Sequence, residues 1–106
     1  MARFFDYSTE KDLASRLSND LARDLPPAMM GDRRKVISVN KVTRLLEKTY
    51  EAAAAYQREN IPGFIRRAVL ANNFKWNLKN KNYPDDFVEM ATEGLVVSMA
   101  GARKNK

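Results

Sequence analysis

The side chains best suited to chemistry in this sequence are basic, and they concentrate near the middle of the chain. Residues 61–83 contain five Lys or Arg residues and no Asp or Glu, and a further run of three basic residues begins at residue 33. Because Lys and Arg neutralise phosphates, this concentration predicts contacts with DNA or RNA. The candidate nucleic-acid-binding residues are Arg33, Arg34, Lys35, Arg66, Arg67, Lys75, Lys79 and Lys81.

Aromatic and amide side chains lie among these basic residues. Trp76 and Tyr83 are there, together with Asn residues at 72, 73, 77, 80 and 82. Aromatic rings can stack on unpaired bases, and Asn can pair with base edges. Each also has a simpler interpretation. Trp76 shares one helical side with Ile65 and Val69, which predicts a core position, and the Asn residues suit a solvent-facing side or a helix end.

Acidic residues near the C-terminus raise the question of a metal site. Asp86, Glu89 and Glu93 are spaced to share one face of a helix, and carboxylate oxygens are ligands that Mg²⁺ and Ca²⁺ accept. The simpler interpretation is a solvated face near a helix N-terminus, where negative charge is favourable. The chain also has no Cys and no His, which removes thiolate and imidazole chemistry. We therefore expect no catalytic residues, no cofactor and no metal site.

Composition indicates a folded protein with a basic surface. The chain has 106 residues, of which 44% are hydrophobic and 30% charged, and its net charge is +6. This length matches one domain. No apolar run approaches the ~20 residues needed to cross a bilayer, and the first residues lack a signal-peptide pattern. We therefore expect a cytoplasmic protein without a membrane partner.

Four segments have helical periodicity and must position these side chains. They run over about 9–25, 39–59, 64–80 and from Pro84 to a stop at Gly101, while residues 28–37 have no clear pattern. Residues 95–97 are also compatible with a short strand, but no partner strand is evident. The expected fold is all-α, a small four-helix bundle-like single domain over residues 1–106, with short connections and with frayed ends at 1–7 and 101–106.

The third of these segments is apolar on two sides, which predicts a central helix with neighbours on both. One apolar stripe consists of Ile65, Val69 and Trp76. The other consists of Phe64, Ala71, Phe74 and Leu78. Its coherent polar face consists of Arg66, Asn73 and Asn77.

Two functions follow most directly, and they stay open at the level of sequence. The first is a non-enzymatic module that binds nucleic acid through phosphates. The second is a protein-interaction module, either a homodimer or a subunit of a larger complex, because Leu70, Phe74, Met90 and Val97 lie off the main apolar stripes. Convergence of the basic residues on a patch free of acids favours the first function, and their dispersal favours the second.

Overall fold

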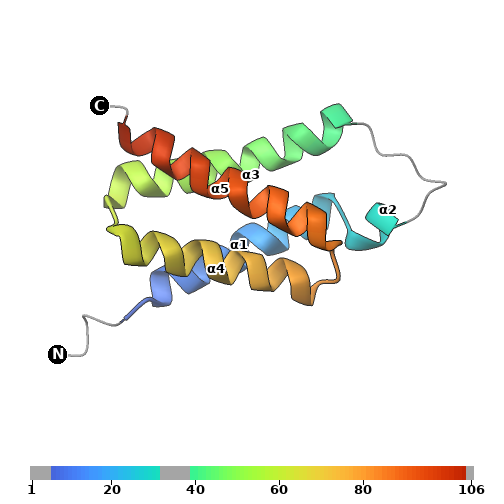
Figure 1. Ribbon diagram of the computed structural model, residues 1–106, viewed down its shortest axis with the longest axis horizontal. Helices are drawn as coiled ribbons and strands as arrows, with labels where there is room; N and C mark the ends of the chain where they lie inside the picture. The colour runs from blue at the N-terminus through green and yellow to red at the C-terminus, as the bar shows by residue number, and fades with distance from the viewer. Residues whose placement is uncertain (1–5, 32–38, 105–106) are drawn as a thin grey trace.

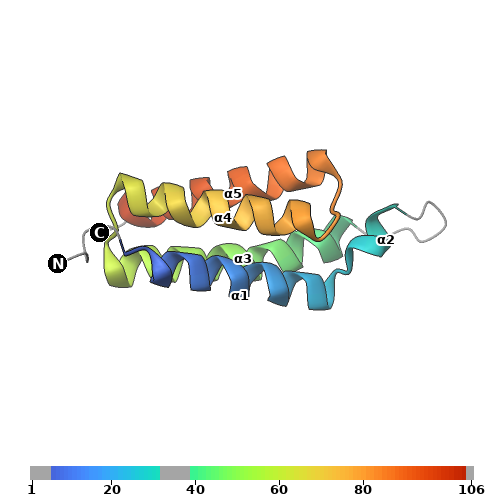
Figure 2. The same ribbon diagram turned by 90° about the horizontal axis from the view of Figure 1, so that it is seen from below.

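The computed structural model describes residues 6–31 and 39–104, which form helices in two layers. The helices are α1 (Ser8–Asp24), α2 (Pro27–Gly31), α3 (Val39–Asn60), α4 (Phe64–Asn80) and α5 (Asp85–Lys104). In Figure 1, α4 and α5 lie in front of α1 and α3, and Figure 2 shows the two pairs as separate layers. The main interlayer contacts join α1 to α4 and α3 to α5. The predicted all-α, bundle-like architecture is confirmed.

Helix boundaries differ from the expected ones at several points. The short helix α2 was not predicted; it begins at Pro27, whose fixed φ suits a first helical position. Residues 95–97, which were also compatible with a short strand, lie within α5. That helix does not stop at Gly101, as expected, but continues to Lys104. At the start of α1, the Ser8 backbone N–H donates to Asp6 Oδ1 over 3.0 Å. This hydrogen bond lowers the pKa of Asp6.

Each of α1, α3 and α5 buries one apolar side in the core. Buried residues on these helices include Leu13, Leu17, Leu21, Leu46, Thr49, Ala53, Tyr56, Phe87, Val88, Ala91, Leu95 and Met99. On α4, the buried side includes Phe74 and Leu78 of one predicted stripe together with Leu70, and all three are completely inaccessible to solvent. None of the helices within residues 6–31 and 39–104 is both long enough and apolar enough to cross a membrane. The cytoplasmic location stays a prediction.

The turn between α4 and α5 is fixed at both of its ends. Asn82 adopts a left-handed φ of 74°, its N–H donates to the Lys79 carbonyl over 3.0 Å, and the Tyr83 N–H donates to the Leu78 carbonyl over 3.3 Å. These two bonds form a Schellman motif, which satisfies carbonyls at the end of α4. The Tyr83 hydroxyl donates to the Leu25 carbonyl, and burial raises the pKa of Tyr83 to about 12. Tyr83 is therefore a structural residue, which removes it from the candidate base-stacking residues.

A glycine allows α3 and α5 to approach closely. A methyl group added at Gly94 would overlap the hydroxyl and ring carbons of Tyr50 on α3. Gly normally weakens a helix by about 1 kcal/mol relative to Ala. At residue 94 the loss of helix propensity is the cost of close packing, because the absence of a side chain lets the Tyr50 ring lie against the α5 backbone.

We expect Gly94→Ala to have opposite effects in two backgrounds. In the wild-type chain it should lower the free energy of unfolding by about 1–3 kcal/mol, because the new methyl group displaces Tyr50. In a Tyr50→Ala background it should raise that free energy by about 1 kcal/mol, because only the gain in helix propensity remains. Urea denaturation of the four proteins measures both effects, and the same sign in both backgrounds would exclude the proposed contact.

Candidate interaction surface

A buried carboxylate joins three helices at one end of the bundle. Glu10 on α1 is only 2% exposed, and it accepts hydrogen bonds from Tyr56 of α3 and Arg66 of α4. The Arg66 Nη1–Glu10 Oε1 distance is 3.1 Å, and Nη1 also donates to the Asp6 carbonyl over 3.1 Å. Burial, followed by the adjacent Glu10 carboxylate, raises the pKa of Tyr56 well above its usual range. Glu10 is therefore a structural anchor and not a solvated residue of the first helical turn.

The anchor determines which side of α4 faces the rest of the protein. Residues Arg66, Asn73 and Asn77 share one side of this helix, and Arg66 directs that side toward α1. Asn73 also satisfies a backbone group there, donating to the Val69 carbonyl over 2.8 Å. The polar face predicted to meet solvent therefore lies partly buried against α1.

The opposite side of α4 is apolar and exposed. Phe64 is 76% exposed, Ile65 59% and Trp76 52%. The prediction that Trp76 lies in the core is therefore wrong, and so is the prediction that Phe64 shares a buried stripe with Phe74. Since α4 is apolar on two sides, its sequence alone does not specify which side is buried, and the anchor at Glu10 supplies the missing constraint.

The turn before α4 contributes another exposed apolar side chain. Ile61 is 76% exposed and has a φ of 46°, in the left-handed region. This conformation costs a β-branched residue about 1–2 kcal/mol, and Gly usually occupies such positions after a helix. Ile61 thus combines backbone strain with exposure of a large apolar side chain, and strain of this kind often accompanies a functional surface.

The predicted nucleic-acid-binding residues within the described part of the chain have different contacts, although Arg67 and Lys75 line the same groove between α4 and α5. Arg66 is paired with Glu10, while Arg67 donates to the Pro62 carbonyl over 3.1 Å. Lys79 lies 3.7 Å from Asp85 Oδ1 and 5.5 Å from the centre of the Trp76 ring. Lys75 lies on the α5 side of α4, and Lys81 follows its last residue. Residues Arg33, Arg34 and Lys35 lie outside the described residues.

An apolar groove separates the outward faces of α4 and α5. Its volume is 420 Å³, and it is lined from α4 by Phe64, Arg67, Ala68, Ala71, Asn72 and Lys75. Thr92, Val96, Met99 and Ala100 line it from α5. Phe64 and Val96, which line it, are themselves exposed to solvent. Two cations and no carboxylate line it.

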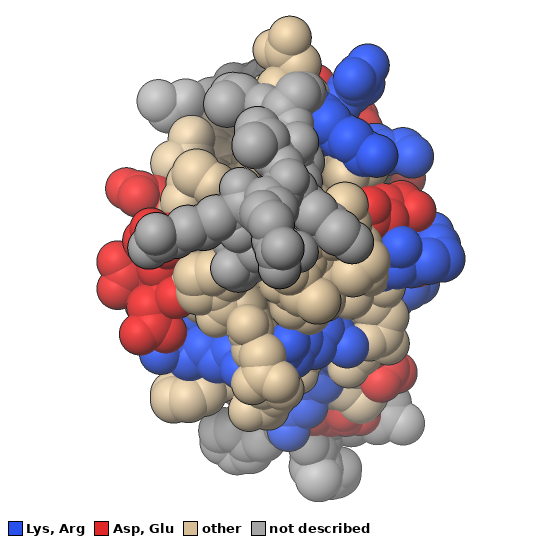
Figure 3. All heavy atoms as spheres, turned by 90° about the vertical axis from the view of Figure 1, so that its right-hand side faces the viewer, with Lys and Arg blue, Asp and Glu red and all other residues tan. Residues whose placement is uncertain are grey.

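The exposed side of α5 combines apolar and acidic residues. Met90 is 49% exposed and Val97 63%, as expected for residues off the main stripe, whereas Leu70 and Phe74 of the same predicted set are buried. Asp86, Glu89 and Glu93 are exposed on this helix. Within the described residues, no group of three or more acidic residues could hold a metal ion. In the end view of Figure 3, the largest group of carboxylates occupies one edge of the bundle, and most Lys and Arg lie at the other edge and below.

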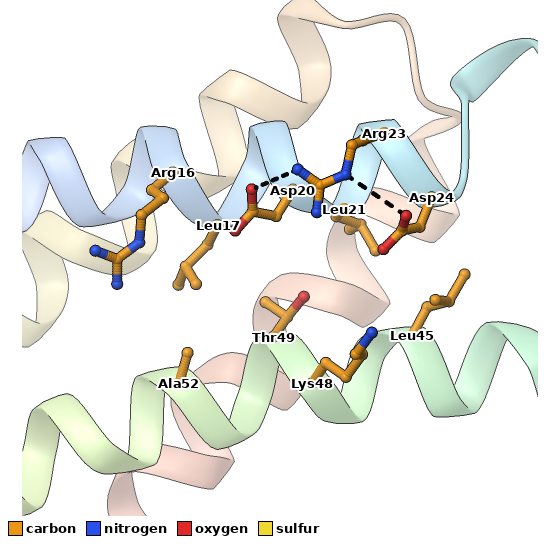
Figure 4. Close-up of a pocket in the computed structure, with 10 residues that line it drawn as sticks. All are labelled: Arg16, Leu17, Asp20, Leu21, Arg23, Asp24, Leu45, Lys48, Thr49 and Ala52. Atoms are coloured by element: carbon orange, nitrogen blue, oxygen red, sulfur yellow. Dashed lines mark hydrogen bonds and ion pairs between the residues drawn. The ribbon is translucent and has the colours of Figure 1, made fainter.

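A smaller groove, of 180 Å³, lies between α1 and α3 (Figure 4). Arg23 bridges two carboxylates there, at 3.3 Å from Asp20 and 3.7 Å from Asp24. Arg16 and Lys48 also line it. Its charges largely compensate one another, so the outward surface of α4 and α5 is the stronger candidate for binding.

Comparisons of the chain with protein-family models, with curated proteins and with solved structures found no match. The residues that sequence reasoning missed are Ile61, Ala68 and Val96, together with the anchor at Glu10. The signal for the anchor was a carboxylate on the apolar side of α1, three residues before Leu13 and seven before Leu17.

We expect Arg66→Ala to destabilise the fold by about 2–4 kcal/mol, because it leaves the buried Glu10 carboxylate without its cation. Arg44 is exposed on α3, and Arg44→Ala should change stability by no more than about 0.5 kcal/mol. Chemical denaturation measures both values. An Arg66→Ala protein as stable as the Arg44→Ala control would show that Arg66 does not anchor α4.

Proposed function

We propose that this protein is a non-catalytic helical module that binds another protein chain through the outward surface of α4 and α5. Large apolar side chains are exposed along that surface, from Ile61 and Ile65 to Trp76 on the α4 side and to Val97 on α5. Exposed apolar surface, where it is extensive, is typical of protein–protein contact sites on soluble domains. Trp is also among the residues most enriched in the energetically dominant parts of interfaces.

The observation that carries this proposal is the orientation of α4. The helix turns Arg66 and Asn73 toward α1 and leaves Ile65 and Trp76 in solvent. Folding of the isolated chain gains nothing from exposing these two residues, whereas burial against a partner gains roughly 1.5–3 kcal/mol for each fully buried side chain. The surface is therefore better suited to contact with a partner protein than to exposure to water.

Nucleic-acid binding is the second candidate, and one observation favours it. Trp76 is exposed with Lys79 over its ring, and Lys75 lies on the same helix. An exposed aromatic ring among lysines suits stacking on an unpaired base and contact with its phosphates. Two facts rank this candidate lower. Lys79 is paired with Asp85, and Arg66 is committed to Glu10.

Site-specific photo-crosslinking in cells tests the proposal. A photoreactive amino acid replaces Ile65 in one variant and Asn19, which is exposed on α1, in a matched control. We expect discrete adducts from residue 65 that protease removes and nuclease does not. Adding Trp76→Asp to the residue 65 variant should reduce the adducts at least about 10-fold, because it places a charge within the apolar surface.

The adducts also separate the two candidates. Adducts that nuclease removes would support nucleic-acid binding and not protein binding. Equal adduct patterns from residues 65 and 19, or no adduct from residue 65, would contradict a binding role for the outward surface of α4 and α5.

A further inference from the structure

The groove between α4 and α5 has the length of a short helical segment. Its α4 wall extends from Phe64 to Lys75, which is about 16 Å or three helical turns. Its α5 wall extends from Thr92 to Ala100, which is about 12 Å. A helix laid along such a groove can direct side chains three and four residues apart into it.

Small side chains in the groove leave space for large apolar side chains of an occupant. Ala68 and Ala71 line it from α4, and Ala100 lines it from α5. Larger apolar side chains, those of Phe64 and Met99, lie toward the end where α4 begins and α5 approaches its last residues. An occupant with large apolar residues three and four positions apart would cover the alanines and remove exposed apolar surface from water.

The cations of the groove have no carboxylate to balance them. Arg67 and Lys75 line it eight residues apart on α4, a separation of about 12 Å along the helix axis. Both side chains are partly buried, and among the described residues neither has an ion-pair partner. Arg67 donates to the Pro62 carbonyl, which is uncharged. Unbalanced positive charge at a partly desolvated surface favours an occupant with negative charge.

Two other hollows between helices differ from this groove in their charges. The groove between α1 and α3 contains Asp20 and Asp24 beside its cations. The hollow between α3 and α5 that Met90 lines contains Glu47 and Glu93 and no cation. An acidic apolar segment would therefore meet carboxylates in both of these hollows, whereas the groove between α4 and α5 offers it cations alone.

We infer that the partner contributes an acidic amphipathic helix, which lies in the groove between α4 and α5. This inference rests on the proposed function and specifies the chemistry of its partner. Apolar side chains of the occupant enter the groove, and two of its carboxylates, seven or eight residues apart, meet Arg67 and Lys75. Such carboxylates are about 10–12 Å apart along a helix axis, which matches the separation of the two cations in either direction of the occupant.

Selection from a peptide library tests the inference. Phage display peptides of about 18 residues, long enough for a helix that spans the groove, on an alanine-rich scaffold whose other positions are randomised. The library is selected on the full chain. We expect the enriched sequences to combine apolar residues three and four positions apart with two carboxylates seven or eight positions apart.

The most enriched peptide, made synthetically, is then the probe for binding to variants at about 0.15 M salt. Lys75→Glu should weaken its binding at least about 10-fold, because it places like charges opposite each other. Ala68→Trp should also weaken it at least about 10-fold, because it fills the groove at an exposed position without a change of charge. Arg44→Glu makes a matched charge change at an exposed position on α3 and should leave binding within about twofold of wild type.

Charge reversal on the peptide identifies the ion pair. Two further peptides each carry Lys in place of one of the two carboxylates. One of them should bind Lys75→Glu at least about 10-fold more tightly than it binds wild type, because opposite charges then face each other again. Thermal unfolding of each protein variant confirms that it folds.

Enriched sequences without the paired carboxylates, or no enrichment at all, would overturn the acidic-helix inference. A probe whose affinity neither Lys75→Glu nor Ala68→Trp changes would also overturn it. Tighter binding of a single-stranded oligothymidylate than of the probe, lost in Lys75→Glu, would replace it with nucleic-acid binding. The proposed function fails separately, since protein adducts from residue 65 would uphold a binding surface even where the peptides show no preference for carboxylates.

Discussion

The ion pair between Arg66 and Glu10 fixes the rotation of α4 about its own axis, and the surface chemistry of the protein follows from that rotation. Hydrophobic burial gives α4 little orientation, because the helix has an apolar stripe on each of two sides. A buried carboxylate that lost its cation would cost several kcal/mol, so the pair penalises any rotation that separates the two residues. Tyr56 adds a donor from α3 and makes the anchor common to three helices.

Once α4 is fixed in this way, its neighbours determine the shape of the exposed surface. The Schellman turn at Asn82 and the Tyr83 hydrogen bond to Leu25 hold the start of α5 against the end of α1. Gly94 lets α5 settle closely on Tyr50 of α3. The outward faces of α4 and α5 then lie side by side and form a groove, with lysine and arginine on the α4 side and carboxylates on the far side of α5.

Sequence periodicity predicted α1, α3 and α5, because each of those helices has one continuous apolar side, which the fold buries. It did not predict the buried side of α4, whose two stripes are equivalent until Arg66 meets a residue 56 positions earlier in the chain. Exposure of Trp76 and Ile65 depends on that long-range contact. The sequence shows the excess of basic residues. The pairing of Arg66 with Glu10 and of Lys79 with Asp85 depends on the tertiary structure, which the spacing of residues along the chain does not reveal.

The intrinsic fluorescence of Trp76 measures the orientation of α4 most directly, because it is the only tryptophan in the chain. In dilute solution, the folded protein should emit near the maximum of the urea-unfolded chain, and acrylamide should quench it readily. Arg66→Ala should shift this emission to shorter wavelength if the freed helix turns Trp76 inward. Blue-shifted, shielded emission from the wild-type protein that moves to longer wavelength only on unfolding would contradict an exposed Trp76 and the surface built around it.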